Sequence, residues 1–190
     1  MDTIIIGGSF NPLHIGHLYL AEEAYVQFRC RSVYLVPSNI SAHKTDKTAI
    51  EPDIRLEMVR RVIEDIPWLH LEDCEIKRGG VSYSIDTVKE MKEKYELNEK
   101  PGLVVGDDLI KDFHMWKDYA SLLEEVQLIV AHRRYKREIE VPYPHCYLDN
   151  TVIPISSSTI REHIKKGLAF RFLIPERVYT FIQTNNLYSS

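Results

Sequence analysis

The sequence has few cysteines and no long apolar run. Its three cysteines, Cys30, Cys74 and Cys146, are too few and too scattered for a disulfide framework or a zinc cluster. Their odd number is typical of a protein in a reducing compartment. No apolar stretch approaches the roughly 18 residues of a membrane helix, and no basic segment precedes the first apolar run. We therefore expect a cytoplasmic protein with no membrane partner.

The sequence also lacks a strong excess of charge, internal repeats and low-complexity segments. A formal net charge of −4 argues against a nucleic-acid partner. The 190 residues contain no Gly/Ser-rich linker, and 44% hydrophobic with 27% charged residues is ordinary for a globular protein. We expect a single domain over residues 1–190, with C-terminal helices from about residue 158 packed onto it.

Hydrophobic patterns of strand and helix type alternate along the chain. Short β-branched or apolar runs predict strands at residues 3–6, 32–37, 69–73, 103–105, 128–131 and 152–155. Apolar residues at helical spacing predict helices within residues 17–28, 52–63 and 85–91, and two more close the chain. This alternation predicts an α/β, Rossmann-like fold with a mainly parallel sheet and helices on both faces. The loops at the carboxyl ends of the strands would then share one site.

A stretch rich in glycine and histidine follows the first predicted strand. Gly7 and Gly8 predict a turn in which a ligand can approach the backbone closely. Pro12 cannot lie inside a helix, so the helix should begin just after it, with His14 and His17 near its N-terminus. Free N–H groups and partial positive charge suit a phosphate there, and the imidazoles add donors. A metal site would need a third ligand, which no usual spacing supplies; incidental histidines on a capped helix are the other alternative.

A second polar stretch begins with four hydroxyl side chains, Ser156, Ser157, Ser158 and Thr159. Thr159 and Glu162 could form a capping box, which is a purely structural interpretation. Arg161 in the first helical turn would oppose the helix dipole by roughly 0.3–1 kcal/mol. A bound polyphosphate would reverse that sign, because Arg161, the hydroxyls and the helix N-terminus would share one anion. Both interpretations stay open at this point.

Both stretches resemble motifs of a known superfamily. His14, Ile15, Gly16 and His17 resemble the HxGH signature of nucleotidyltransferases, which also matches the first signature of class I aminoacyl-tRNA synthetases. Residues 155–161 resemble the ISSTxIR motif of nicotinate-nucleotide adenylyltransferases. Segments similar to that family continue along nearly the whole chain, at residues 39–44, 78–87, 106–116 and 173–176.

Two related families fit less well. A synthetase is disfavoured because the chain is short and lacks the lysine-rich second signature of those enzymes. Pantetheine-phosphate adenylyltransferases share the HxGH motif and a late serine/arginine motif. They lack segments similar to residues 82–84 and to the one around Trp116.

The resemblance implies a nucleotidyltransferase fold and a reaction in NAD biosynthesis. The adenylyl group of ATP would pass to nicotinate mononucleotide by direct in-line attack, giving deamido-NAD and pyrophosphate without a covalent intermediate. The implied catalytic residues are His14, His17, Lys44 and Arg161. The implied ATP-binding residues are Gly7, Gly8, Ser9, Phe10, Gly106, Asp108, Ser156 and Ser157. The implied mononucleotide-binding residues are Asn39, Tyr83, Ser84, Trp116 and Arg133.

The expected partners are ATP and nicotinate mononucleotide, and a homo-oligomer stays open. Mg²⁺ would arrive with the ATP phosphates rather than at a metal site of the protein, because it needs few protein ligands when phosphates supply oxygens. A predicted helix start at residues 83–86 offers free N–H groups that would favour the carboxylate of the acid over the carboxamide of its amide analogue.

Other interpretations of single residues, and of the whole chain, remain. Spacing alone favours a helix cap for Asp108 as much as a ribose contact, and Trp116 could anchor the core or surface instead of stacking on the pyridine ring. A nucleotide-binding regulator that keeps the fold without turnover is the alternative function. The chain departs from the family pattern at Asn11 for Asp, Ser158 for Thr, Ser41 and Ala42 for two prolines, and Arg134 and Tyr135 for Pro-Gly. The last departure puts the role of Arg133 in doubt.

Overall fold

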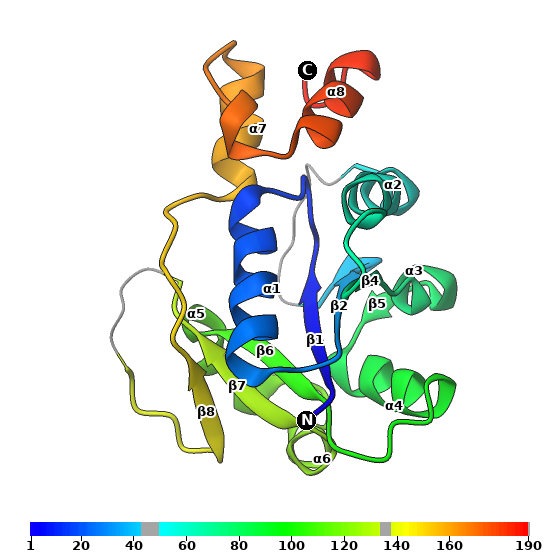
Figure 1. Cartoon of the computed structure of the whole chain (residues 1–190), viewed down its shortest axis with the longest axis vertical. Coiled ribbons are helices and arrows are strands. Elements are labelled where there is room, and N and C mark those ends of the chain that lie inside the picture. Colours follow the sequence, from blue (N-terminus) through cyan, green and yellow to red (C-terminus); the bar gives the residue numbers. More distant parts are fainter. Residues whose placement is uncertain (43–49, 134–137, 190) are drawn as a thin grey trace.

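The computed structural model of the chain describes residues 1–42, 50–133 and 138–189, and its centre is a parallel sheet (Figure 1). The strands of this sheet are β1 (Thr3–Gly8), β2 (Ser32–Pro37), β4 (Leu69–Leu71), β6 (Gly102–Gly106), β7 (Gln127–Ala131) and β8 (His145–Leu148). Neighbouring strands are parallel, in the order β4-β2-β1-β6-β7-β8. The strand order reverses between β1 and β6, and in such sheets this switch point is where ligands bind.

Five of the six predicted strands lie in this sheet, and the prediction of a strand at residues 152–155 was wrong. Those residues form no strand, whereas β8 pairs with β7, with Leu148 opposite Ala131. Pro154 interrupts the predicted strand, and proline cannot donate to a ladder hydrogen bond. The sequence of β8 contains neither a β-branched run nor a clear alternation, so hydrophobic pattern alone could not identify it.

Alternate residues of β1 point to opposite faces of the sheet, and each face has its own core. Ile4 and Ile6 belong to a buried cluster with residues of α1 (Ile15–Phe28) and α2 (Pro52–Ile63). Ile5 belongs to a second cluster with residues of α4 (Ser84–Lys94) and α6 (Tyr119–Glu125). The predicted α/β fold with helices on both faces is therefore confirmed. Within the described ranges, no helix has both the length and the apolar character needed to cross a membrane.

Several short elements escaped the sequence analysis. They are α3 (Cys74–Arg78), α5 (Asp107–Ile110), the 3₁₀ helix η1 (Phe113–Met115), and the strands β3 (Ile40–Ser41) and β5 (Val81–Ser82), which pair with each other in parallel. Elements of two to five residues are too short to produce a readable periodicity. They matter because most of them lie within or beside the segments that resemble the adenylyltransferase family.

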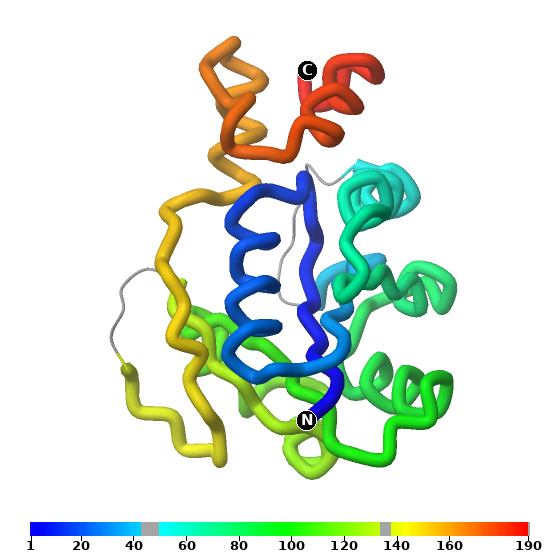
Figure 2. The backbone as a smooth tube through the Cα atoms, in the orientation of Figure 1, coloured from blue at the N-terminus to red at the C-terminus, as the bar shows by residue number. Residues whose placement is uncertain are grey.

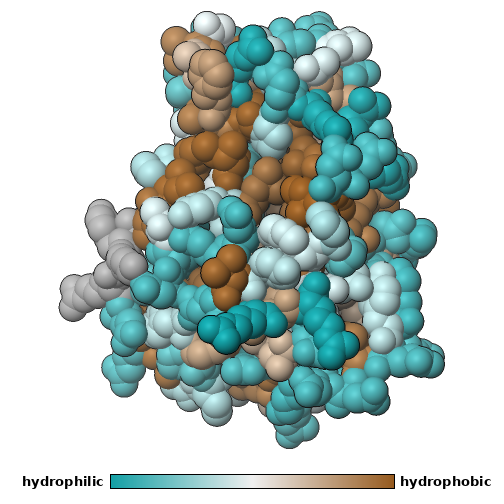
Figure 3. Space-filling view, in the orientation of Figure 1, coloured by the Kyte–Doolittle hydropathy of each residue, from teal (hydrophilic) through white to brown (hydrophobic). Residues whose placement is uncertain are grey.

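The C-terminal elements are α7 (Ser157–Lys165), the 3₁₀ helix η2 (Arg171–Leu173) and α8 (Glu176–Thr184). They lie beyond the carboxyl end of β1 (Figures 1 and 2), and a third buried cluster joins Met58 of α2 to Ile160 and Val178. In Figure 3, apolar atoms gather between these helices and the start of α1. The Tyr188 hydroxyl donates to Oδ1 of the buried Asn11 at 2.8 Å, so the end of the chain contacts the loop after β1.

Candidate active site

The loop after β1 is built differently from the predicted glycine turn. Gly7 and Gly8 belong to the strand, opposite Val36 and Pro37 of β2, so the prediction that they form a turn was wrong. The turn follows at residues 9–14 and includes Phe10 at a φ of 45°. Gly7 is exposed, and nothing lies within 4 Å of where its Cβ would stand. The Phe10 ring instead fills the space beside Gly8, at 3.1 Å from its missing Cβ.

Helix α1 begins at Ile15, with His14 as its N-cap, rather than directly after Pro12. The N–H groups of His17 and Leu18 donate to the carbonyl oxygen of His14, at 3.0 and 3.4 Å. Among the described residues, none accepts from the N–H groups of Ile15 and Gly16, and the first turn contains no acidic residue. This helix end therefore retains both the free donors and the partial positive charge that bind anions.

The two predicted histidines form a stacked pair at this helix end. Their ring centroids lie 3.6 Å apart with an angle of 23° between the planes. The His14 N–H donates to Nδ1 of His17 at 3.2 Å, so a neutral His17 carries its proton on Nε2. A Cβ on Gly16 would stand 3.1 Å from Nδ1 of His14, so glycine between the histidines leaves room for the His14 ring.

His14 is buried and neutral at pH 7. His14 is only 2% exposed, and its Nδ1 is a buried atom without a hydrogen-bond partner among the described residues. Burial, and secondarily the positive charge of Arg133, lower the pKa of His14 from 6.5 to about 4. A buried polar nitrogen without a partner is costly, and a ligand atom could satisfy it.

The start of α7 lies against the same loop. Ser156 caps the helix by accepting from the Thr159 N–H at 3.1 Å, which rules out the alternative that Thr159 is the cap. Because α7 begins at Ser157, Arg161 is its fifth residue and lies beyond the first turn, where it was predicted. The Ser157 hydroxyl donates to the Pro12 carbonyl oxygen at 2.9 Å. Arg161 donates through Nη1 to the Asn11 carbonyl oxygen at 2.7 Å, and its Nη2 lies 3.4 Å from Oγ of Ser158. Residues about 150 positions apart in sequence are thus brought together.

Gly106, Asp108 and Arg133 meet at the adjacent ends of β6 and β7. A Cβ on Gly106 would stand 2.8 Å from Cγ of Arg133, so glycine makes room for this side chain. Nε of Arg133 lies 3.9 Å from Oδ1 of Asp108. Asp108 is not a helix cap, because the N-cap of α5 is Gly106 and Asp108 lies inside the helix. His14 and Arg133 line one small pocket, which connects this edge to α1.

The four remaining mononucleotide residues lie on a separate side. Asn39 donates through its side chain to the Gly80 carbonyl oxygen at 2.9 Å, which fixes it beside β5. Tyr83 is the N-cap of α4, and Ser84 is its first residue. The half-buried Trp116 packs on Phe113 with 4.8 Å between ring centroids. Tyr83 and Trp116 both pack against the same buried cluster, which brings these segments together.

One ion pair lies between these segments and helix α4. Nζ of Lys117, the residue after Trp116, lies 4.7 Å from the centroid of the Tyr83 ring. The same ammonium is 2.8 Å from Oδ2 of Asp86, in the first turn of α4. Among the described residues, none accepts from the N–H groups of Ser84 and Ile85. This end of α4 therefore offers donors, an aromatic surface and a partly neutralised acidic residue.

One predicted site residue lies outside the described ranges, and three buried polar residues beside the site escaped the sequence analysis. Lys44, the fourth predicted catalytic residue, falls outside the described residues. Arg55, His132 and Asn150 were not predicted; each is buried next to the site, and His132 and Asn150 exchange hydrogen bonds of 2.8 and 3.0 Å. A signal for Arg55 existed, because helical spacing places it on the same face as Met58 and Val59.

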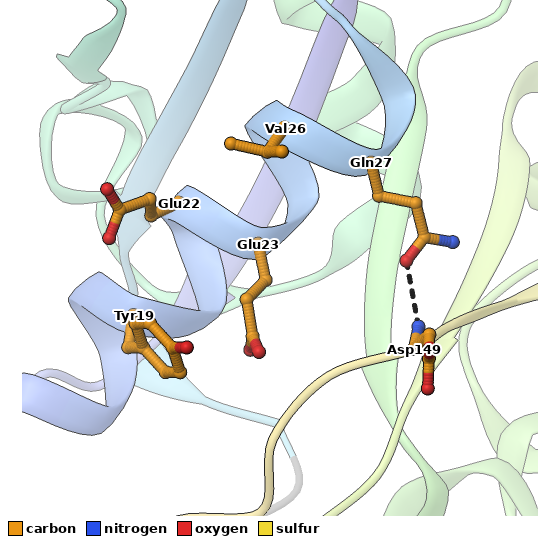
Figure 4. Close-up of a pocket in the computed structure, with 6 residues that line it drawn as sticks. All are labelled: Tyr19, Glu22, Glu23, Val26, Gln27 and Asp149. Atoms are coloured by element: carbon orange, nitrogen blue, oxygen red, sulfur yellow. Dashed lines mark hydrogen bonds between the residues drawn. The ribbon is translucent and has the colours of Figure 1, made fainter.

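A second hollow, of about 450 Å³, lies on the outer side of α1 (Figure 4). Tyr19, Glu22, Glu23, Val26, Gln27 and Asp149 line it. Gln27 accepts from the backbone N–H of Asp149 at 2.8 Å, which fixes the segment leading from β8 toward α7. None of the predicted site residues that the structure describes lines this hollow.

The strand order, the start of α1 and the histidine pair are those of a parallel α/β protein whose helix end suits an anion, and comparison with known proteins identifies its class. A family model described as cytidylyltransferase-like matches residues 5–163. The chain belongs to this family of nucleotidyltransferases, and within it to the nicotinate-nucleotide adenylyltransferases, as its full-length relatives show. The resemblance seen in the sequence is therefore confirmed.

Those relatives include two bacterial proteins named "Probable nicotinate-nucleotide adenylyltransferase". The protein of Borreliella burgdorferi is 40% identical over 99% of this chain and 97% of its own length. The protein of Desulfitobacterium hafniense is 34% identical over 97% of this chain and 94% of its own length.

Two solved structures share the fold. The nicotinic acid mononucleotide adenylyltransferase of Plasmodium falciparum complexed with NaAD superimposes with a TM-score of 0.79, at 23% identity, covering 99% of this chain and 98% of that one. The same protein complexed with APC gives a TM-score of 0.76 at 22% identity, covering 98% of this chain and 96% of that one. At this identity the likeness supports the fold.

Proposed function

We propose that the chain transfers the adenylyl group of ATP to nicotinate mononucleotide, forming deamido-NAD and releasing pyrophosphate. The observation that carries this proposal is the convergence of two helix starts, those of α1 and α7, on the loop after β1. His14 and His17 lie on one side of that loop, and Arg161 lies on the other. Such a concentration of donors around a guanidinium suits a polyphosphate, and the described residues of this loop form no Ser-His-Asp arrangement.

The ATP phosphates would lie over the start of α1. Nε2 of His17, the N–H groups of Ile15 and Gly16, and the Arg161 guanidinium would donate to phosphate oxygens. Phe10 would contribute its backbone N–H rather than its ring, because the ring packs beside Gly8 and no described residue accepts from that N–H. The exposed backbone of Gly7 would allow the nucleotide to lie directly on the end of β1.

The reaction would need no general base. The phosphate monoester of nicotinate mononucleotide has a second pKa near ~6, so it is largely ionised at pH 7. Its oxygen would form a bond to the α-phosphorus as the bond from that phosphorus to the bridging oxygen breaks, and pyrophosphate would leave with the electron pair. The protein would align the two anions and stabilise the charge that develops on the transferred group and on pyrophosphate.

His14 has a distinct role in this scheme. Its pKa of about 4 keeps the free imidazole neutral, so it can donate or accept a hydrogen bond without first losing a proton. An anion at the start of α1 would favour a proton on His14. We propose that phosphate binding supplies the missing partner of Nδ1.

Nicotinate mononucleotide would bind with its pyridine ring at the other side of the site. The ring would stack on Trp116, and its carboxylate would accept from the N–H groups of Ser84 and Ile85 at the start of α4. The carboxamide of the amide analogue would place an NH₂ donor against these donors. Unpaired buried donors cost about 1–3 kcal/mol each, so the acid should be preferred.

Magnesium would enter as part of MgATP. The groups around the start of α1 are imidazoles, N–H donors and a guanidinium, which suit phosphate oxygens rather than a hard cation. The ATP phosphates would supply the oxygens that Mg²⁺ prefers. We therefore assign Mg²⁺ to the substrate rather than to a metal site of the protein.

A pyrophosphate-release assay tests the proposal. MgATP is mixed with nicotinate mononucleotide, nicotinamide mononucleotide or phosphopantetheine, and each acceptor is also measured without ATP. We expect fast release with the acid, slower release with the amide, and none with phosphopantetheine. Tight binding of both nucleotides without any pyrophosphate would contradict the proposal and favour a regulator that has kept the fold.

A further inference from the structure

Arg55 is a buried charged residue in the first turns of α2. It is 1% exposed, and it is among the largest fully buried side chains of the described chain. A buried guanidinium is strongly unfavourable unless hydrogen bonds replace its water. Burial of this charge lowers stability unless its contacts compensate, so the contacts of Arg55 indicate its role.

The guanidinium donates to carbonyl oxygens in three separate segments. Nη1 donates to Ser9, in the loop after β1, at 2.7 Å. Nη2 donates to Ser38 at 2.6 Å and to Asn39 at 3.1 Å, both in the loop after β2. Nε donates to Ile50, just before α2, at 3.2 Å. One side chain thus joins the loop of the proposed phosphate site to the loop that carries Asn39.

These contacts also fix the directions of neighbouring N–H groups. In a trans peptide the N–H points opposite to the preceding C=O. When the Ser9 oxygen points at Arg55, the Phe10 N–H must point away from it, and none of the described residues accepts from that N–H. When the Ser38 oxygen points at Arg55, the Asn39 N–H points away and donates to Oγ of Ser82 at 2.9 Å.

We propose that Arg55 is a positioning residue for adenylyl transfer. It holds the loop after β1, where ATP would bind, in place relative to the loop after β2, which carries Asn39. The proposal rests on the proposed function of the site. Arg55 would act through the backbone of Ser9, a predicted ATP-binding residue, and of Asn39, a predicted mononucleotide-binding residue. A planar guanidinium is required, because an ammonium is a point charge that cannot hold the same fork of contacts.

Kinetics of Arg55→Lys and Arg55→Met, measured well below the melting temperature of each variant, test this role. Misalignment of reacting groups by about 1 Å can cost on the order of 100-fold, so we expect kcat of Arg55→Lys to fall about 100-fold. KM for each substrate should change less than kcat, because the groups that bind substrate remain. Arg60→Met is the matched control: Arg60 is exposed on the same helix and pairs with Glu57, so the parent values should be kept.

A second measurement separates this proposal from the proposed function. Amide hydrogen exchange without substrates should become faster at residues 9–14 and 38–41 in Arg55→Lys, while β6 and the middle of α1 keep the parent rates. This readout stands even if the parent releases no pyrophosphate, in which case the proposed function alone fails. Parent-like kcat in a folded Arg55→Lys, or exchange that rises uniformly, would overturn the positioning role. Failure of both variants to fold at 15 °C would overturn it too, by reducing Arg55 to a support of the fold.

Discussion

The starts of α1 and α4 are the two helix ends to which we assign the substrates, and their surroundings differ. Both have two N–H groups that donate to none of the described residues. The first turn of α1 contains no acidic residue, and the histidine pair and Arg161 surround it. The first turn of α4 contains Asp86, which Lys117 neutralises in part, and aromatic rings lie beside it.

This difference indicates how one backbone feature can serve two ligands. A helix N-terminus supplies only about half a positive charge. The side chains around a helix N-terminus must therefore determine which anion binds there. At α1 they add donors and a cation, which suits the several charges of a triphosphate. At the start of α4 the charges of Asp86 and Lys117 offset each other, and the aromatic rings add an apolar surface, which suits a ring with a single carboxylate.

The largest effect should come from the α1 side. His17→Ala removes a donor that faces developing charge, and such losses typically lower kcat by roughly 10²–10³. We expect the variant to fold, with pyrophosphate release reduced by that factor. His70→Ala, on the edge strand β4, is the control. Activity within threefold of the parent would remove His17 from the mechanism.

The buried, neutral His14 should make stability depend on pH. The unfolded chain binds this proton near pH 6.5, and the folded chain binds it only near pH 4, because burial lowers the pKa. The contribution is complete above about pH 6.5 and is lost as the pH falls toward 4. Between pH 7 and pH 5 we expect the parent to lose about 2 kcal/mol more unfolding free energy than His14→Asn.

Denaturant titrations of both proteins at the two pH values measure this difference. His14→Asn keeps every carboxylate of the parent, so their titration cancels in the comparison. Equal pH dependence of the two proteins would show that His14 is not held neutral by burial.

Arg161→Lys should weaken the use of ATP. The guanidinium spans the Asn11 carbonyl oxygen and the Ser158 hydroxyl, which a single ammonium cannot do. We expect KM for ATP to rise about tenfold, with little change in melting temperature. Arg171→Lys is the control, since Arg171 pairs with Glu176 away from the loop after β1. A large loss of melting temperature with unchanged kinetics would favour a structural role for Arg161.

The smallest effect should come from the α4 side. Lys117→Met leaves Asp86 negative in the first turn of α4, which disfavours a carboxylate nearby. The pair is partly exposed, so the preference for the acid over the amide, as a ratio of kcat/KM values, should fall only about threefold. Lys111→Met is the control. An increased ratio would show that the carboxylate does not bind at the start of α4.

Trp116→Ala tests whether the tryptophan contacts the pyridine ring or its substituent, because stacking depends on the ring more than on the substituent. The variant should lose several-fold in kcat/KM with both mononucleotides and keep their ratio nearly unchanged. A ratio that collapses would show that Trp116 contacts the carboxylate or carboxamide rather than the ring face.

Long periodic segments made most of the fold predictable. The buried strand that contains Ile4, Ile5 and Ile6 and the amphipathic helix after Pro52 could be read directly, because burial on a face imposes a period. Motif spacing placed His14 and His17 at a helix start, where they are found, whereas Arg161 lies in the second turn of α7 rather than in the predicted first turn. The rule that ligands bind at the carboxyl ends of parallel strands then brought them to one edge.

Features that depend on tertiary contacts could not be predicted. Gly7 and Gly8 form a strand because β2 continues beside them as far as Pro37, which nothing local indicates. Ser156 rather than Thr159 caps α7, a difference of three residues that periodicity does not resolve. The role of Arg55 depends on three loops that meet only in the folded chain.

The central claim is that the start of α1, rather than that of α4, holds the polyphosphate. Protein labelled with ¹⁵N-histidine tests it directly by NMR at pH 7, with MgATP added to saturation as judged by calorimetry and with His14→Asn and His17→Ala used for assignment. We predict that MgATP shifts the ring nitrogens of His14 and His17 and leaves those of His70 unchanged. Unshifted resonances of His14 and His17 at saturation would contradict the claim, because the phosphates would then lie elsewhere.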